Sequence, residues 1–253
     1  MKKNNGFFKA ILALSVTAAL FSCNGSSSDN STTTKDSAAA TKDSTASMPT
    51  PPAPAPAGPT VPFDVVTVYH TIKDYKVWRP VFDADSTRRK AAGLTDVAVE
   101  RAADKPDNIK LVFMVSDMAK AKALASDPGL KQTMDKAGVI SKPEMKYWKI
   151  VRFNPENLKA NDNRLEVVHK VKDFDTWLKG YDAEGPATRA ANGMNDLAIG
   201  RGIDDSNLVH LVFEVTDIAK AKARMADPAL KKIMMDAGVE GAPSVHFYQD
   251  ASK

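Results

Sequence analysis

Two histidines, His70 and His169, are the residues of this sequence best suited to chemistry. Each ends a short run in which apolar residues alternate with others, so each shares a strand face with the apolar side chains before it. An imidazole accepts a proton or a hydrogen bond near neutral pH. We therefore interpret both as candidate catalytic bases. The alternative is that each is a core histidine whose hydrogen bonds are satisfied by its surroundings.

The same pattern of aromatic and basic residues follows each histidine. A tryptophan and a second aromatic residue fall on one face of the helix expected next, and an arginine lies further along. With the histidine they would form a small apolar pocket with a few polar groups. The alternative is ordinary core packing. The pocket residues predicted in this way are Trp78, Phe82, Arg89, Trp177, Tyr181 and Arg189.

Two further arginines, Arg101 and Arg201, end the next expected strand of each half. A guanidinium group binds carboxylates and phosphates through paired hydrogen bonds, so both join the predicted ligand pocket. The alternative for each is an ion pair with a nearby aspartate, or exposure to water.

A third set of polar residues lies on strands expected near the end of the chain. His210 and Glu214 alternate onto one strand face, and His246 and Tyr248 share a face of the last strand. Two histidines and a glutamate on neighbouring strands can bind a divalent metal. Their spacing matches no metal motif, and the sequence has no nucleophile elbow, phosphate loop or paired-cysteine site. We predict neither a metal nor a cofactor.

These residues are positioned by elements that occur twice. Residues 111–139 and 211–239 are identical at 18 of 29 positions, which predicts a tandem duplication. In both copies an apolar run suits a buried strand, and an aspartate then caps a helix. An Asp-Pro pair starts a second helical piece, and a glycine ends it.

Each copy predicts the order strand, helix, strand, strand, helix, strand. Pro80 and Pro186 leave the extent of the first helix of each copy uncertain. The predicted strands are Asp64–His70, Leu94–Arg101, Lys110–Val115, Met145–Val151, Leu165–His169, Asn195–Arg201, His210–Val215 and Val245–Tyr248. Helices are predicted to start at Asp74, Asp117, Asp127, Asp173, Asp217 and Asp227.

This order predicts an α+β fold made of two tandem ferredoxin-like βαββαβ units, 63–152 and 164–250, joined by a linker over 153–163. Helices cover one face of such a sheet and leave the other bare. We expect the two bare faces to pack sheet to sheet, which gives one intramolecular α+β barrel and a monomer. Glu166 and Lys170 alternate onto the bare face and would have to lie at the rim or pair with each other.

The chain resembles a known superfamily. The resemblance is carried in the first copy by Lys73-Asp74-Tyr75, Trp78, Phe82, Gly93, Arg101, Asp127-Pro128 and Ala137-Gly138-Val139, and the second copy repeats the pattern. It is similar to the dimeric α+β barrel superfamily, in particular to small bacterial proteins described as cyclase-like or antibiotic-biosynthesis-monooxygenase-like. That resemblance implies the barrel fold. Its functions range over cofactor-free oxygenases, haem-degrading enzymes and isomerases, and the Asn-Trp-His set of the haem-degrading branch is not evident here.

The first 62 residues predict where in the cell the protein is located. Lysines followed by an apolar run indicate a signal peptide over 1–22, and Cys23 after Leu20-Phe21-Ser22 resembles a lipobox cysteine. An ordinary secretory signal is the alternative. Residues 23–62 are rich in Ser, Thr, Ala and Pro, which predicts a disordered tether. We expect a bacterial lipoprotein, held in the outer membrane by lipid on Cys23 and facing the periplasm.

Charge narrows the partners, and two functions remain open. Without the three signal-peptide lysines, 32 basic residues face 31 acidic ones, which argues against a nucleic-acid partner. The first hypothesis is a lipid-anchored envelope protein that binds a small, partly apolar ligand or an envelope partner. The second is a cofactor-independent monooxygenase or isomerase acting on an aromatic or polyketide-like compound, with His70 or His169 as base.

Overall fold

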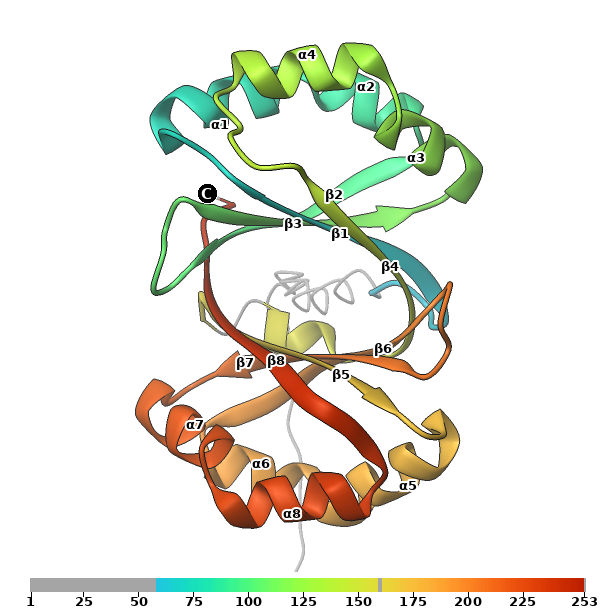
Figure 1. Cartoon of the computed structure of the whole chain (residues 1–253), viewed down its shortest axis with the longest axis vertical. Helices are drawn as coiled ribbons and strands as arrows, with labels where there is room; N and C mark the ends of the chain where they lie inside the picture. Colours follow the sequence, from blue (N-terminus) through green and yellow to red (C-terminus); the bar gives the residue numbers. More distant parts are fainter. Residues whose placement is uncertain (1–57, 159–160, 253) are drawn as a thin grey trace, which may run out of the picture. The chain divides into compact units, whose positions relative to one another are not determined.

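Two βαββαβ repeats and the connection between them make up the described chain (Figure 1). The computed structural model describes residues 58–158 and 161–252; the predicted signal peptide, Cys23 and most of the predicted tether lie outside them. The first repeat comprises β1 (Phe63–Thr71), α1 (Tyr75–Ala84), α2 (Ser86–Ala91), β2 (Leu94–Ala102), β3 (Asn108–Val115), α3 (Met118–Ala125), α4 (Pro128–Lys136) and β4 (Glu144–Phe153).

The second repeat follows a short 3-10 turn, η1 (Pro155–Leu158), and has the same order. It comprises β5 (Asn163–Val171), α5 (Phe174–Glu184), α6 (Pro186–Ala191), β6 (Met194–Gly202), β7 (Leu208–Val215), α7 (Ile218–Met225), α8 (Pro228–Asp236) and β8 (Val239–Asp250). The last strand is much longer than the sequence predicts, because β8 pairs with β5 at both ends of that strand, Lys170 with Glu240 and Asn163 with Gln249.

The eight strands close into one antiparallel barrel in the order β1-β3-β2-β8-β5-β7-β6-β4. Closure depends on the last strand of each repeat, which pairs with its own sheet and with the other. β4 pairs with β1 and β6, and β8 pairs with β5 and β2. The predicted fold class, two ferredoxin-like units forming one intramolecular α+β barrel, is therefore confirmed.

Side chains of α1 hold the end of the chain against the first repeat. The Tyr75 hydroxyl and the Arg79 guanidinium donate to the carbonyl of Ala251, at 2.9 and 2.7 Å, and Arg79 also donates to the carbonyl of Ser252 at 3.1 Å. These bonds continue the β2–β8 closure beyond the last strand residue. They bring together residues far apart in the chain.

Each repeat has a break where the sequence predicts one helix. α1 contains Pro80 and runs on to Ala84, and α2 begins at Ser86 after the turn at Asp85. In the second repeat Pro186 starts α6, where a residue without an N–H leaves no intrahelical bond unmade. Gly185 precedes it with φ 81°, a left-handed conformation that glycine adopts without strain.

Three apolar cores hold these layers together. One lies between α1–α4 and their sheet, and a second lies between α5–α8 and theirs; these two helix layers stand at the top and bottom of the view in Figure 1. The third lies inside the barrel and includes Val65, Trp148, Ile150 and Val168. No helix in the described part of the chain is both long and apolar enough to cross a membrane.

Candidate functional site

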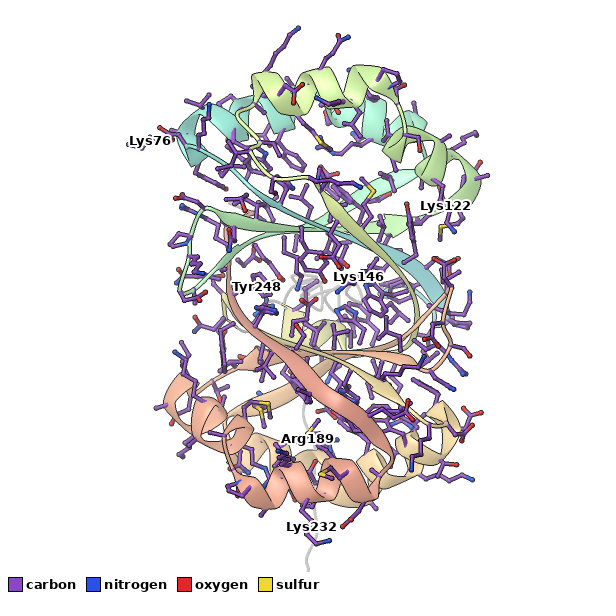
Figure 2. The ribbon with its side chains drawn as sticks, in the orientation of Figure 1. Lys76, Lys122, Lys146, Arg189, Lys232 and Tyr248 are labelled. Carbon is purple, nitrogen blue, oxygen red and sulfur yellow. The ribbon has the colours of Figure 1, made fainter. Side chains whose placement is uncertain are left out.

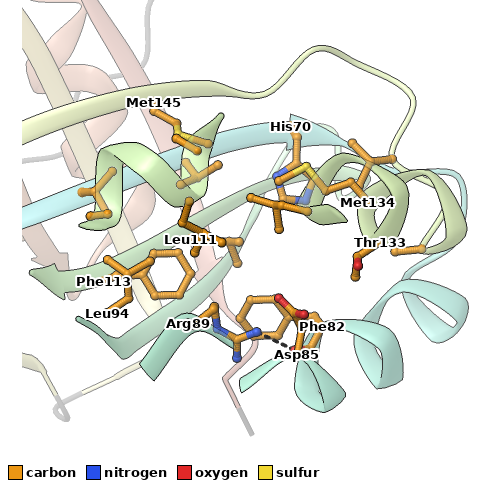
Figure 3. Close-up of a pocket in the computed structure, with 18 of the residues that line it drawn as sticks. His70, Phe82, Asp85, Arg89, Leu94, Leu111, Phe113, Thr133, Met134 and Met145 are labelled. Carbon is orange, nitrogen blue, oxygen red and sulfur yellow. Dashed lines mark hydrogen bonds between the residues drawn. The ribbon is translucent and has the colours of Figure 1, made fainter. Parts of the chain in front are cut away.

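A cavity of about 90 Å³ lies between the first sheet and its helices (Figure 3). β1 contributes His70 from the strand face that the alternation predicts, together with Val66 and Val68. Helices α1 and α2 contribute aromatic and arginine side chains, and α3 and α4 form the cover. The polar and aromatic lining residues are His70, Trp78, Phe82, Asp85, Arg89, Phe113, Thr133 and Tyr147.

His70 is the polar group of this cavity that has nothing to bind. Its side chain is buried, and neither ring nitrogen has a hydrogen-bond partner among the described residues. Burial lowers the pKa of His70 to about 4, so the ring is neutral at physiological pH. The Trp78 ring lies 5.7 Å away and itself stacks on Phe82 at 4.9 Å. A neutral imidazole in such surroundings can accept a hydrogen bond from a hydroxyl or amide group.

The guanidinium of Arg89 is hydrogen-bonded to other residues of the protein. It makes a two-bond pair with Asp96, at 2.9 and 2.7 Å, and donates to the carbonyl of Phe82 at 2.6 Å. It also lies 3.8 Å from the centre of the Phe82 ring. This residue lines the cavity, as expected, but it joins α1 and α2 to β2 and leaves little capacity to hold an anion.

The second repeat builds a similar cavity of about 70 Å³. His169 is buried with no partner for either ring nitrogen in the described chain, and burial lowers its pKa to about 4. Its ring lies 5.4 Å from Trp177. Tyr181 replaces phenylalanine and donates to Asp196 at 2.9 Å; burial and that carboxylate raise the pKa of Tyr181 far above its usual value.

Arg189 repeats the part that Arg89 has in the first repeat. It pairs with Asp196 through two bonds of 2.7 Å and lies 3.8 Å from the Tyr181 ring centre. The structure thus brings His169, Trp177, Tyr181 and Arg189 together as the sequence pattern suggests.

Arg101 and Arg201 line neither helix–sheet cavity. Arg101 donates to the carbonyl of Pro106 at 2.8 Å and lies 4.4 Å from the Tyr75 ring centre. Arg201 donates to the carbonyl of Ser206 at 2.9 Å and lies 4.3 Å from the Phe174 ring centre. Both arginines brace the loop that follows their strand, so their geometry favours the alternative to a ligand role.

The barrel lumen contains a polar cluster that the sequence pattern does not predict. Glu166, which was expected at the rim or paired with Lys170, is 1 % exposed. It pairs with Lys110 Nζ at 3.2 Å and His210 Nε2 at 2.7 Å, and it accepts from Tyr69 Oη at 3.0 Å. Lys170 pairs instead with Asp205 at 2.9 Å. We call Tyr69, Glu100, Lys110, Trp148, Glu166, His210 and Tyr248 the lumen cluster.

Charges inside this cluster stabilise one another. Burial raises the pKa of Glu166, but the Lys110 ammonium and His210 more than offset that effect and hold the pKa well below its usual range. Burial likewise lowers the pKa of Lys110, and Glu100, only 2.6 Å away, with Glu166 raises it above its usual value. The Trp148 ring stacks on His210 at 4.5 Å. Figure 2 shows the Tyr248 side chain between the two sheets.

The pattern contains a signal that could have found this cluster. Lys110 and Glu166 both alternate onto the face opposite the helices, where an unpaired charge would be costly. Two opposite charges on the facing sheets therefore indicate a pair across the lumen. The three residues of the possible metal set do not meet: His210 binds Glu166, His246 binds Ser244, and Glu214 accepts from Asn161 and Asn195.

Comparison of the sequence with protein-family models and with curated proteins gives no match. Solved structures resemble the fold. An anthrone oxidase-like protein has a TM-score of 0.51 at 15% identity, over 75% of this chain and 91% of its own. A proposed monooxygenase from Lactobacillus acidophilus has 0.47 at 12%, over 74% and 94%, and a monooxygenase-like protein from Listeria innocua has 0.43 at 11%, over 76% and 96%.

At these identities, the likeness establishes the fold alone. The chain shares with the anthrone oxidase-like protein an α+β barrel fold, and here one polypeptide supplies both halves of the barrel.

Proposed function

We propose that this protein binds a small, flat, mainly apolar molecule bearing a hydroxyl group in the helix–sheet cavity of the first repeat. The observation that carries the proposal is His70, a buried neutral imidazole with two unpartnered nitrogens in a mainly apolar cavity. A hydroxyl of the ligand would donate to one of them. Trp78 and Phe82 offer ring faces for a flat ligand.

The first repeat is favoured over the second for two reasons. Its cavity is the larger, about 90 against 70 Å³. Its cover is also less anchored, because α4 has no buried residue, whereas Leu230 of α8 is buried. A helix with little buried surface can shift at low cost to admit a ligand.

A direct test compares 1-naphthol with naphthalene as probes of the full chain, by titration calorimetry. The hydroxyl is expected to strengthen binding about 3- to 10-fold, the worth of one hydrogen bond. That preference should disappear in His70→Phe and persist in the matched variant His169→Phe. Equal binding of both probes to the unmodified protein would exclude the proposed role of His70.

Turnover is the second candidate function. His70 is also the side chain of this cavity placed to take a proton from such a ligand, which is the first step of a cofactor-free oxygenation or isomerisation. Burial lowers the pKa of His70 to about 4, so this role requires the ligand anion that forms to stabilise the protonated ring. The anthrone oxidase-like structural neighbour supports trying anthrone as substrate. Oxygen consumption that depends on both anthrone and His70 would support catalysis. Binding without oxygen consumption would leave the protein a binder.

We also propose that the barrel is anchored to the outer membrane by lipid on Cys23, on the periplasmic side. The lipobox-like sequence supports this location. Cys23→Ser is expected to move the protein from the membrane fraction to the soluble fraction after cell disruption. Retention of the cleaved variant in membranes would show that another feature anchors it.

A further inference from the structure

A third, larger cavity lies in the barrel lumen, separate from both helix–sheet cavities. Its volume is about 660 Å³, within the range of roughly 300–1,000 Å³ typical of small-molecule sites. Both repeats line it, mostly with apolar side chains such as Val65, Val112, Met114, Ile150, Leu197 and Val212. An apolar molecule would therefore meet a largely preformed wall.

Three buried polar side chains of the lumen cluster reach this cavity. Glu100, Lys110 and His210 line it, and their exposed fractions are 4, 1 and 3 %. Lys110 is occupied by Glu100 and Glu166 and by the Tyr248 ring, whose centre lies 4.5 Å from Nζ. Its capacity to hold an added anion is small.

His210 has one ring nitrogen left for a ligand. An ionised carboxylate can only accept hydrogen bonds, so His210 Nε2 must donate to Glu166. The other ring nitrogen, Nδ1, is buried without a hydrogen-bond partner among the described residues, and it is an acceptor in the tautomer that carries its proton on Nε2 alone. A buried acceptor left unpaired costs free energy that a donating group would recover.

Charge favours a donor that is neutral or positive. Two buried carboxylates, Glu100 and Glu166, lie beside one ammonium group, Lys110, and the His210 ring. Two more acidic residues, Asp96 and Glu156, line the cavity, and Asp96 is already paired with Arg89. A carboxylate or phosphate head would bring further negative charge close to these four acidic side chains.

The cluster is also asymmetric in a way that two identical chains could not achieve. Glu100 pairs with Lys110 in the β2–β3 ladder, and the same place in β6–β7 holds Gly200 and His210. Thr67 opposite Val112 likewise corresponds to Glu166 opposite Val212. In a barrel of two identical chains each of these groups would occur twice, so the single chain permits one head-group site.

We propose that the lumen binds one molecule with an apolar body and a hydrogen-bond-donating head, an amine or a hydroxyl, directed at His210 Nδ1. The apolar body lies among the valine, leucine and isoleucine side chains. This site is independent of the cavity that contains His70.

The first test titrates the full chain with three probes of equal length, decylamine, decanol and decanoate, by calorimetry. We expect the amine or the alcohol to bind one per chain and at least tenfold more tightly than decanoate. Equal binding of all three, tighter binding of decanoate, or no saturable binding would overturn the proposal.

Two matched pairs of variants locate the site. Ala198→Phe narrows the lumen cavity and should weaken the preferred probe at least tenfold, whereas Ala125→Phe narrows the helix–sheet cavity and should leave it unchanged. His210→Phe should remove the preference for donor heads, and the exposed His246→Phe should keep it. Thermal unfolding of each variant checks that it is folded.

The same variants separate this inference from the proposed function. Loss of decylamine or decanol binding in Ala125→Phe, but not in Ala198→Phe, would place the probe in the helix–sheet cavity and refute the lumen site. The two outcomes are independent, because 1-naphthol tests His70 and the decyl probes test His210. Absence of naphthol binding would therefore leave the lumen proposal standing.

Discussion

At the scale of single residues, His70 and His169 make the fold sensitive to acid. Both pKa values are lowered by burial from 6.5 to about 4. As the pH falls below 6.5 the unfolded chain takes up protons that the folded chain refuses, so stability is lost between pH 6.5 and 4. Each histidine accounts for about 2 kcal/mol between pH 7 and pH 5.

Replacing both histidines by phenylalanine should therefore remove about 4 kcal/mol of that loss. The measurement is the free energy of unfolding in urea at pH 7 and pH 5. His246→Phe, at an exposed position, serves as control and should follow the unmodified protein. An unchanged pH dependence in the double variant would show that neither buried ring resists protonation.

Glu166 is the residue on which the lumen cluster depends. Glu166→Gln keeps the shape but leaves Lys110 with Glu100 as its one carboxylate among the described residues, and we expect a loss of about 3 kcal/mol at pH 7. Glu144→Gln, which removes an exposed partner of Lys146, should cost less than about 1 kcal/mol. Because the pKa of Glu166 is lowered, its contribution holds above pH 4.5 and falls on further acidification. Equal costs for the two variants would contradict this account.

At the scale of elements, the turn from α6 to β6 is fixed by close approach. Gly193 has φ 75°, and a Cβ atom there would lie 2.7 Å from the backbone oxygen of Asp217, the N-cap of α7. The Gly193 carbonyl also accepts a hydrogen bond from the N–H of Thr216 at 2.9 Å. The turn thus joins the end of one helix to the start of another.

Gly193→Ala should therefore destabilise the protein by more than the cost of placing alanine at a positive φ. Gly241 has φ 72° and nothing within 4 Å of its would-be Cβ, so Gly241→Ala measures that cost, about 1–2 kcal/mol. We expect Gly193→Ala to cost at least about 2 kcal/mol more, since backbone must move. Chemical denaturation measures the free energy of unfolding of the two variants. Equal losses would mean that the α6–β6 turn shifts to accommodate the added methyl group.

At the scale of the whole molecule, β4 and β8 make the two repeats one folding unit, because each pairs with a strand of its own repeat and a strand of the other. A chain ending at Phe153 would leave β4 without β6 and β2 without β8, and would expose the lumen face of its sheet. We expect it to dimerise or aggregate. The whole chain carrying Cys23→Ser should be a monomer with one unfolding transition.

Size-exclusion chromatography with light scattering, together with denaturation curves, checks both expectations. A stable monomeric half, or two separate transitions in the whole chain, would show that the repeats fold independently despite the shared barrel.

Much of this molecule follows from local sequence. The duplication, the capping aspartates and the alternation of β1 and β5 predict the elements and the strand faces of His70 and His169. These features depend on residues close together in the chain, for which period and capping chemistry are sufficient. The tryptophans and Arg89 and Arg189 reach the cavities for the same reason, since each lies within about 20 residues of its histidine.

Tertiary structure alone decided which groups meet. Alternation assigns Glu166 and Lys110 to the lumen face, but their contact requires the β4–β6 and β2–β8 pairing that brings the two sheets together. The bonds of Arg101 and Arg201 depend on loop geometry, which side-chain period does not encode. The partner of a buried charge is set by the closed barrel, because neighbours across the lumen come from strands far apart in the chain.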